Sequence, residues 1–355
     1  MNEQVRLATP QPVRKAAGEP HMGWVRRLAP ADAIASTGGR SALSPNARQP
    51  GARVATGLTA RTGTFAVTDL LLVLAVAVMW GSSFLFIRIS AGAFQPPVVA
   101  FLRIGFGAAV LGLFPAARRR VPRADWPAIA LLGLVWMALP FVLFAAAERQ
   151  INSSLAGMIN AAAPLFTALV AAVAARHPPG GRQTAGLLLG FAGVVILSWP
   201  ALGHAHATAL AVGLVLAATA LYGVAFNLAP PLERRNGALA VVWWAQLAAL
   251  AIIAPFGLAS AGASSFTWAS LLAAAALGII GTALAFVAFT TLVGRVDSTR
   301  GSVTTYLLPL VAIGLGATIR GETITALPAT GTIVVLAGAY LTATGHRRAR
   351  RMSAR

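Results

Sequence analysis

Long apolar blocks recur along most of this chain, and this pattern limits its fold more than any other feature. Between residues 69 and 345, runs of roughly 18 to 25 mostly apolar residues follow one another, each long enough to cross a hydrocarbon core of about 30 Å as an α-helix. The connections are short, so consecutive helices are expected to be antiparallel neighbours. The blocks predict an all-α membrane protein with ten transmembrane helices, at residues 69–89, 96–116, 126–147, 152–174, 183–200, 207–228, 238–259, 268–292, 301–320 and 327–344.

The composition also favours a protein that lies mostly in the membrane. Hydrophobic residues make up 57% of the 355 residues and charged residues only 10%, whereas soluble domains contain roughly 45 to 50% apolar and about 25% charged residues. The net charge of +19 comes from 28 Lys and Arg against 9 Asp and Glu. All but a few of these charges lie outside the apolar blocks, so no nucleic-acid partner is expected. The chain has no Cys, which excludes disulfides, zinc ribbons and thiol nucleophiles.

The distribution of arginine predicts the orientation. With a cytoplasmic N-terminus, the opposite side holds only Arg88, Arg149 and Arg320. This asymmetry follows the positive-inside rule, and an even number of spans then places both termini in the cytoplasm. Because 27 Arg stand against a single Lys, a bias typical of GC-rich bacterial genomes, we expect a multi-pass protein of the bacterial cell (inner) membrane. The cytoplasmic loops hold Arg118, Arg119, Arg120, Arg123, Arg176, Arg182, Arg234, Arg235, Arg295 and Arg300.

The two ends of the chain differ from its apolar part. Residues 1–68 carry nine Lys or Arg and many Pro, Gly, Ser and Ala, without an apolar run that resembles a signal-peptide core. They predict a disordered basic cytoplasmic tail. Its charges are spread out, so we favour a solvated tail over one that binds anionic lipid. Residues 345–355 form a second basic cytoplasmic tail.

The two halves of the apolar part repeat each other. Residues 138–144 match residues 283–289 at an offset of 145, and the same offset pairs Gly133 with Gly278. In the first and sixth spans Trp80 corresponds to Tyr222 at an offset of 142, a slip that a loop absorbs. Five helices are therefore duplicated, as residues 69–200 and 207–344. Because five is odd, the second copy enters the membrane in the opposite direction, and two inverted five-helix repeats result.

These residues resemble a known family, the EamA-like branch of the drug/metabolite transporter superfamily, across about residues 69–345. The similarity rests on residues 80–84 (Trp-Gly-Ser-Ser-Phe), residues 101–103 (Phe-Leu-Arg), and residues 307–309 (Leu-Leu-Pro) followed by residues 321–322 (Gly-Glu). The resemblance implies two five-helix bundles around a central pocket and the transport of small metabolites, frequently the export of amino acids or related compounds. We therefore expect a secondary transporter that works by alternating access.

Two alternatives to a metabolite exporter remain, a drug efflux carrier and a passive channel. A channel conducts without saturation, whereas a carrier shows countertransport. The sequence also departs from the family pattern after the fourth span, where a Gly-Glu pair is common and this chain has Ala175, Arg176 and His177. A symmetric acidic pair is therefore not expected.

Arg103 is the most unusual residue within a span. It lies about eight residues into the second span, where a charge costs roughly 2.5 to 3.5 kcal/mol on insertion scales. No acidic residue lies deep in any span. Three alternatives remain for its partner: a backbone carbonyl, the headgroup region reached by snorkelling, or the carboxylate of an anionic substrate. The planar guanidinium can bind such a carboxylate with two hydrogen bonds.

Other polar and aromatic residues within spans are candidates for the pocket. Asn160 and Thr305 occupy equivalent repeat positions, four residues before a proline, where a kink frees backbone groups and admits water. The alternatives are hydrogen bonds between helices, worth about 0.6 kcal/mol each, and ordinary packing of the aromatic rings. The predicted substrate-binding residues are Trp80, Ser83, Arg103, Asn160, Tyr222, Thr305 and Tyr306.

Two glutamates lie near the outer ends of spans. Glu148 follows the third span and Glu322 follows the ninth. A buried carboxylate there has a raised affinity for protons and couples transport to the proton gradient. The alternative is that Glu322 pairs with Arg320 and Glu148 with Arg149.

The sequence carries no pattern of an enzyme. It has no Gly-x-Ser-x-Gly turn, no His-Glu-x-x-His pair and no phosphate loop, so we expect neither catalysis nor a cofactor or metal. The expected partners are a small-molecule substrate and the lipid bilayer. Gly186 and Gly190 form a small-xxx-small pattern, which marks a homodimer face or close packing within the bundle, and we favour the packing.

Overall fold

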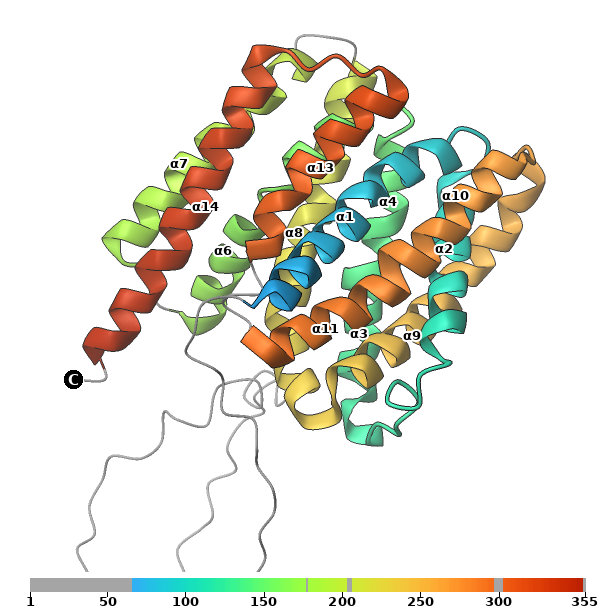
Figure 1. Cartoon of the computed structure of the whole chain (residues 1–355), viewed down its shortest axis with the longest axis horizontal. Helices are drawn as coiled ribbons and strands as arrows, with labels where there is room; N and C mark the ends of the chain where they lie inside the picture. The colour runs from blue at the N-terminus through green and yellow to red at the C-terminus, as the bar shows by residue number, and fades with distance from the viewer. Residues whose placement is uncertain (1–65, 177, 203–205, 297–302, 354–355) are drawn as a thin grey trace, which may run out of the picture. The chain divides into compact units, whose positions relative to one another are not determined.

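The computed structural model describes residues 66–176, 178–202, 206–296 and 303–353, and over these ranges it contains ten helical spans (Figure 1). The predicted ten-helix architecture is confirmed. Seven spans are single helices: α1 (Val67–Ser90), α2 (Pro96–Leu111), α7 (Gly181–Leu202), α8 (His206–Asn236), α9 (Ala238–Ala259), α13 (Val303–Arg320) and α14 (Ala326–Ser353). The other three are α3 (Trp126–Gly133) with η4 (Leu134–Ala138) and α4 (Leu139–Ala147), α5 (Ser153–Asn160) with α6 (Ala163–Ala175), and α10 (Trp268–Gly278) with η6 (Ile279–Leu284) and α11 (Ala285–Val296).

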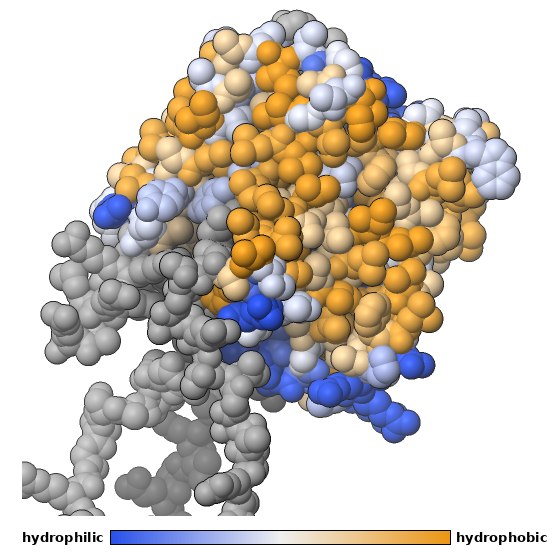
Figure 2. Space-filling view, viewed as in Figure 1, coloured by the Kyte–Doolittle hydropathy of each residue, from blue (hydrophilic) through white to orange (hydrophobic). Residues whose placement is uncertain are grey.

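Eight of these spans are long and apolar enough to cross a membrane, while α2 and α13 are shorter apolar helices. Many large apolar side chains are exposed, as expected where lipid replaces water; on α1 they include Leu71, 60% exposed, and Val78, 53% exposed. Figure 2 shows apolar residues across the middle of one face and hydrophilic residues mainly towards its ends. Helices suit this environment because they satisfy their own backbone hydrogen bonds.

Some helix ends differ from the prediction. The helix α2 ends at Leu111, five residues before the predicted end, because Gly112 and a series of turns follow. The sixth span continues through two prolines to Asn236 and ends where Gly237 adopts a positive φ of 86°, a conformation that favours glycine. The helix α14 continues to Ser353, through much of the predicted basic tail. The predicted N-terminal tail lies almost wholly outside the described residues.

Two spans contain a π-helical turn at the same place in each repeat. The turns η4 (third span) and η6 (eighth span) begin at Leu134 and Ile279, which are separated by the repeat offset of 145. Each follows a glycine of the matched pair Gly133 and Gly278. A π-helical turn changes the direction of side chains along a helix and is often found at functional sites.

The matched prolines of the fourth and ninth spans, each expected to kink its helix, have different effects in the two repeats. The fourth span breaks before Pro164, since α5 ends at Asn160 and α6 begins at Ala163, so the kink expected there is confirmed. At the matched Pro309, α13 continues without a break.

The two repeats pack against each other along most of their length. The helix α1 contacts α13, α10 and α11, and α2 contacts α9, while α8 contacts α4 and α6. The last helices of the repeats, α7 and α14, lie side by side (Figure 1). A helix of one repeat is therefore positioned by helices of the other.

Glycines allow α7 and α14 to approach closely. A Cβ on Gly193 would lie 2.5 Å from the amide nitrogen of Val335, and a Cβ on Gly338 would collide with the backbone of Gly190. A Cβ on Gly186 would meet Thr342. The small-residue pattern of α7 is therefore used for close packing within the chain, in line with the interpretation favoured from the sequence.

Candidate functional site

Arg103 lies buried between the two repeats. Its side chain is on α2 and is only 7% exposed. Its Nε donates a hydrogen bond of 3.1 Å to the hydroxyl of Thr282 in η6, and its guanidinium carbon lies 3.6 Å from the centre of the Phe141 ring on α4. No residue in the described ranges accepts a hydrogen bond from its two terminal amino groups. Arg103 is therefore held by a hydroxyl and a ring rather than by a carboxylate.

The π-helical turn places Thr282 against Arg103. The Thr282 hydroxyl donates to the carbonyl of Leu277, five residues earlier, while it accepts the bond from Arg103. The eighth span approaches α2 closely at Gly278, because glycine has no side chain. A Cβ at this position would lie only 2.5 Å from the carbonyl oxygen of Arg103. The turn and the missing side chain together bring the hydroxyl to the guanidinium.

A continuous series of aromatic rings connects the two repeats beside this arginine. Neighbouring ring centres are 4.9 to 6.2 Å apart, distances typical of favourable aromatic pairs. We call this series the aromatic arc; in order, its members are Phe84, Phe144, Tyr222, Phe226, Trp136, Phe286, Trp80 and Phe289.

The aromatic arc follows the repeat symmetry. Trp80 contacts Phe289 at 4.9 Å, and its counterpart Tyr222 contacts Phe144 at 5.8 Å. Phe144 and Phe289 are themselves a matched pair. The two aromatic residues that the sequence singled out for a shared role thus make equivalent contacts and belong to one cluster.

Two further predicted pocket residues, Ser83 and Tyr306, contact residues other than Arg103. Ser83, 6% exposed, donates to the carbonyl of Met79, and a Cβ on Gly281 in η6 would lie 2.5 Å from its hydroxyl oxygen. Tyr306 packs against the apolar core that includes Phe84 and Phe144.

Asn160 and Thr305 belong to α5 and α13, which pack together. Asn160 is 7% exposed, and its side-chain amide oxygen, Oδ1, has no hydrogen-bond partner in the described part of the chain. In these ranges no hydrogen bond joins Asn160 or Thr305 to Arg103.

Two residues of the site, Thr282 and Phe141, were not predicted from the sequence, although both hold Arg103. Gln246, a polar side chain within the seventh span, is fully buried, and neither of its amide atoms is hydrogen-bonded among the described residues. Phe141 lay within the matched segments of the repeat, so its pairing with Phe286 was a usable signal. Nothing in the sequence indicated that Thr282 faces Arg103.

Glu322 binds the start of another helix. It accepts hydrogen bonds from the backbone amides of Ser153 and Ser154 at 3.0 and 2.9 Å, and from both of their hydroxyls. Burial alone would raise the pKa of Glu322, but these four hydrogen bonds outweigh it and hold the pKa below its ordinary value. A carboxylate at a helix N-terminus is also stabilised by the helix dipole. Glu322 therefore joins the second repeat to α5 of the first.

Glu148 has a different environment. It is fully buried, and neither carboxylate oxygen has a hydrogen-bond partner among the residues described. Arg88 donates to the backbone carbonyl of Glu148 rather than to its side chain. Burial raises the pKa of Glu148 well above its ordinary value; Arg88 and Arg103 oppose this effect, and Glu322 adds to it.

The neighbouring arginines do not pair with these glutamates. Arg149 donates to Gln95 at 2.8 Å, and over the described ranges the ion pairs formed are Arg235 with Asp125 and Arg295 with Asp69. The alternative of pairs between Glu148 and Arg149 and between Glu322 and Arg320 is therefore not found.

Comparison with known proteins places this arrangement in a family. Residues 68–199 and 209–344 each match the EamA-like transporter family, so the match covers both repeats. The chain belongs to the EamA-like transporter family. A relative named "Probable terminal-alkyne amino-acid exporter", from Streptantibioticus cattleyicolor, is 30% identical over 74% of this EamA-like chain and 89% of its own length. The Salmonella typhimurium protein named "Probable amino-acid metabolite efflux pump" is 27% identical over 79% of this chain and 96% of its own.

The fold of this EamA-like protein also resembles a solved structure. That structure, titled "Crystal structure of protein", superposes with a TM-score of 0.54 at 20% identity, over 78% of this chain and 96% of the other. The family and the names of the relatives indicate a multi-pass membrane exporter of small metabolites, rather than an enzyme.

Proposed function

We propose that this EamA-like protein is a secondary transporter that exports small amphipathic metabolites with a carboxylate, such as amino acids, by alternating access. The observation that carries the proposal is Arg103, a buried cation whose terminal amino groups have no acceptor in the described part of the chain. An arginine fork matches a carboxylate in geometry and charge. The relatives named as amino-acid exporters support the same class of substrate.

The aromatic arc suits the apolar part of such a substrate. Tyr222 lies within electrostatic range of Arg103, and Phe141, which stacks on the guanidinium, is the repeat counterpart of Phe286 in the arc. Ligand sites in proteins generally combine a few convergent polar groups with apolar and aromatic walls. The carboxylate would bind to Arg103 and the side chain would lie on the rings.

The matched π-helical turns are the proposed hinges of alternating access. Each turn is preceded by a glycine that lies against the backbone of the neighbouring helix. A Cβ on Gly278 would collide with the backbone of Arg103, and a Cβ on Gly133 would collide with that of Ala245. Two equivalent hinges in inverted repeats allow the halves to exchange conformations, so that a central site opens first to one side and then to the other.

Glu148 is the proposed proton-coupling residue, whereas Glu322 is proposed to fix α5. A carboxyl group whose oxygens lack partners and whose burial favours the neutral form changes its charge when water or substrate reaches it. Glu322 already accepts four hydrogen bonds, so its protonation would break existing contacts. We further propose that the protein resides in the bacterial inner membrane with both termini in the cytoplasm, following the arginine asymmetry.

Countertransport in proteoliposomes tests the proposed function. Vesicles that contain the full-length protein are preloaded with a mixture of amino acids, and labelled amino acids are added outside one at a time. We expect transient accumulation of at least one of them, with loss of accumulation in the variant Arg103→Gln and retention in the matched control Arg149→Gln, whose side chain is exposed. A leak that rises in proportion to concentration would contradict a carrier and favour a channel. Accumulation of drugs but of no amino acid would favour a drug efflux carrier.

A further inference from the structure

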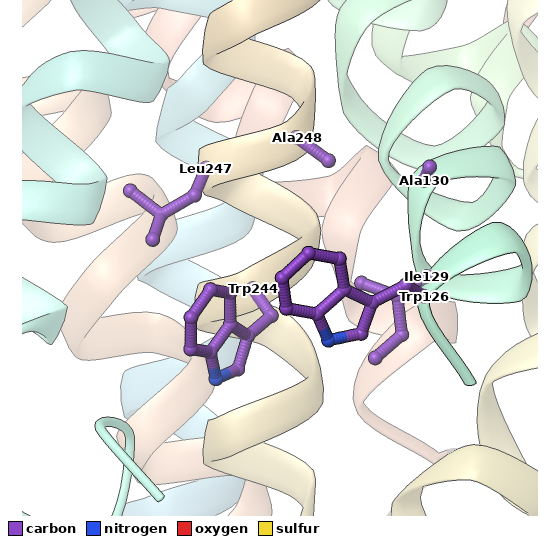
Figure 3. Close-up of a pocket in the computed structure, with 6 residues that line it drawn as sticks. All are labelled: Trp126, Ile129, Ala130, Trp244, Leu247 and Ala248. Carbon is purple, nitrogen blue, oxygen red and sulfur yellow. The ribbon is translucent and has the colours of Figure 1, made fainter. Parts of the chain in front are cut away.

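An apolar hollow lies between the third and seventh spans, away from the aromatic arc. Its volume is about 300 Å³. Figure 3 shows its side chains, with the two indoles of α3 and α9 next to each other. Every residue that lines it is apolar or aromatic, and both repeats contribute: Trp126, Ile129 and Ala130 from α3, and Trp244, Leu247 and Ala248 from α9.

The indole N–H groups of both tryptophans donate hydrogen bonds to the loop at one end of the hollow. Trp244 donates its indole N–H to the carbonyl of Arg119 at 2.9 Å, and Trp126 donates to the carbonyl of Val121 at 3.3 Å. Their rings are stacked with centres 6.0 Å apart. The hollow itself is therefore left without a polar group, and it is open to the surroundings, since Trp126 is 50% exposed.

The same loop carries a dense positive charge. Arg118, Arg119, Arg120 and Arg123 are all exposed. None of the four forms an ion pair with a residue of the described ranges, in contrast to Arg235, which pairs with Asp125. The structure thus combines an apolar seat with an adjoining group of unpaired cations at the arginine-rich end of the helices.

We propose that this hollow binds one anionic phospholipid, with an acyl chain in the hollow against the rings of Trp126 and Trp244 and the acidic headgroup over the arginines of residues 118–123. The occupant is identified by charge complementarity, because the loop offers four cations beside an apolar slot. Anionic lipids are attracted by basic residues next to a membrane-spanning helix, and basic pockets between such helices bind acidic headgroups. A second copy of the chain would bring a second group of arginines to the first, so a protein partner of the same kind is disfavoured.

The bound lipid would connect the two repeats. The helix α3 continues directly into η4, and α9 packs against that turn. A lipid that contacts both α3 and α9 therefore lies beside one of the proposed hinges, but the binding site does not depend on the proposed substrate or on the direction of transport.

Native mass spectrometry of the full-length protein tests the site. The protein is purified in detergent and titrated with palmitoyl-oleoyl phosphatidylglycerol or with the phosphatidylcholine of the same chains. We expect one phosphatidylglycerol to be retained at least tenfold more tightly than phosphatidylcholine. The variant Ala248→Phe, which fills the hollow, should remove this tight site, while Leu188→Phe on the exposed face of α7 should not.

The arginines provide a second, independent arm of the test. Replacing Arg118, Arg119, Arg120 and Arg123 together with Gln should reduce the preference for phosphatidylglycerol to less than twofold, and replacing all four with Lys should largely restore it. Equal binding of the two lipids by the unaltered protein would overturn the proposal. The proposal would also be overturned if the preference for phosphatidylglycerol depended on the arginines but persisted in Ala248→Phe. Attraction of the headgroup would then not require an acyl chain in the hollow. A melting temperature unchanged in Ala248→Phe shows that the fold is intact.

Discussion

Replacing Thr282 with Val tests whether a hydroxyl on the π-helical turn holds the buried guanidinium of Arg103. The change keeps the size of the side chain and removes two hydrogen bonds, the one that Thr282 accepts from Arg103 at 3.1 Å and the one that it donates to Leu277. The contact between Arg103 and Phe141 remains, so the variant is expected to fold. The matched control is Thr219→Val, since Thr219 is also fully buried and donates only to Val215 in its own helix.

The magnitude follows from the type of each bond. A hydrogen bond to a charged group contributes about 1.5 to 3 kcal/mol, whereas a hydrogen bond between uncharged side chains and backbone in a membrane contributes about 0.6 kcal/mol. Both variants lose one bond within a helix, and only Thr282→Val also loses the bond to Arg103. We therefore expect the free energy of unfolding to fall by about 1.5 to 3 kcal/mol more in Thr282→Val than in Thr219→Val.

The assay is reversible unfolding of the full-length protein by a denaturing detergent, with the affinity for the countertransported substrate measured in parallel. The account predicts weaker substrate binding in Thr282→Val, because the guanidinium loses the group that orients it, and unchanged binding in Thr219→Val. Equal losses of stability in the two variants, together with equal affinities, would refute the assigned role of Thr282.

Three further predictions concern other contacts. Glu148→Gln should stabilise the protein at pH values above the ordinary pKa of a carboxyl group, because the raised pKa of Glu148 makes its ionisation unfavourable in the folded state. The same variant should no longer be stimulated by a proton gradient. Stability and gradient-driven transport that both match the unaltered protein would contradict this prediction. For Glu322 the sign is opposite: its lowered pKa adds stability that is lost as pH falls through that value, so melting temperatures between pH 7 and 3 should fall less in Glu322→Gln, and parallel curves would count against the hydrogen bonds to Ser153 and Ser154. Gly338→Val should destabilise the protein by at least 1 kcal/mol because a Cβ collides with Gly190, and unaltered detergent unfolding would exclude the tight packing of α7 and α14.

The helices were predictable from the sequence because each depends on a local property. Hydropathy and length identified ten spans, and the break before Pro164 followed from the missing amide hydrogen of proline. The π-helical turns were not predictable in the same way. Proline lies near η4, at Pro140, but no proline lies in or next to η6, so proline does not mark both turns. A glycine precedes each turn, but glycines such as Gly186 and Gly190 also lie within α7, which has no such turn.

The site was only partly predictable, since its contacts join residues far apart in the chain. The repeat identified Trp80 and Tyr222 as a pair, and the structure places both in one aromatic arc. The partner of Arg103 is 179 residues away, and the partners of Glu322 are 168 and 169 residues away. Such contacts depend on how α2, η6 and α5 pack, which a single sequence does not specify. Local reasoning therefore offered Arg320 and Arg149 as partners for the two glutamates, and neither pairs with them among the described residues.

The central claim is that Arg103 binds the carboxylate of the exported substrate between the two repeats. The most direct measurement is competition of countertransport by an amino acid and by its methyl ester, in the unaltered protein and in Arg103→Gln. The account predicts that the unaltered protein prefers the free carboxylate by at least tenfold and that Arg103→Gln loses this preference while it still folds. An equal preference in both proteins would contradict the claim and assign Arg103 a purely structural role.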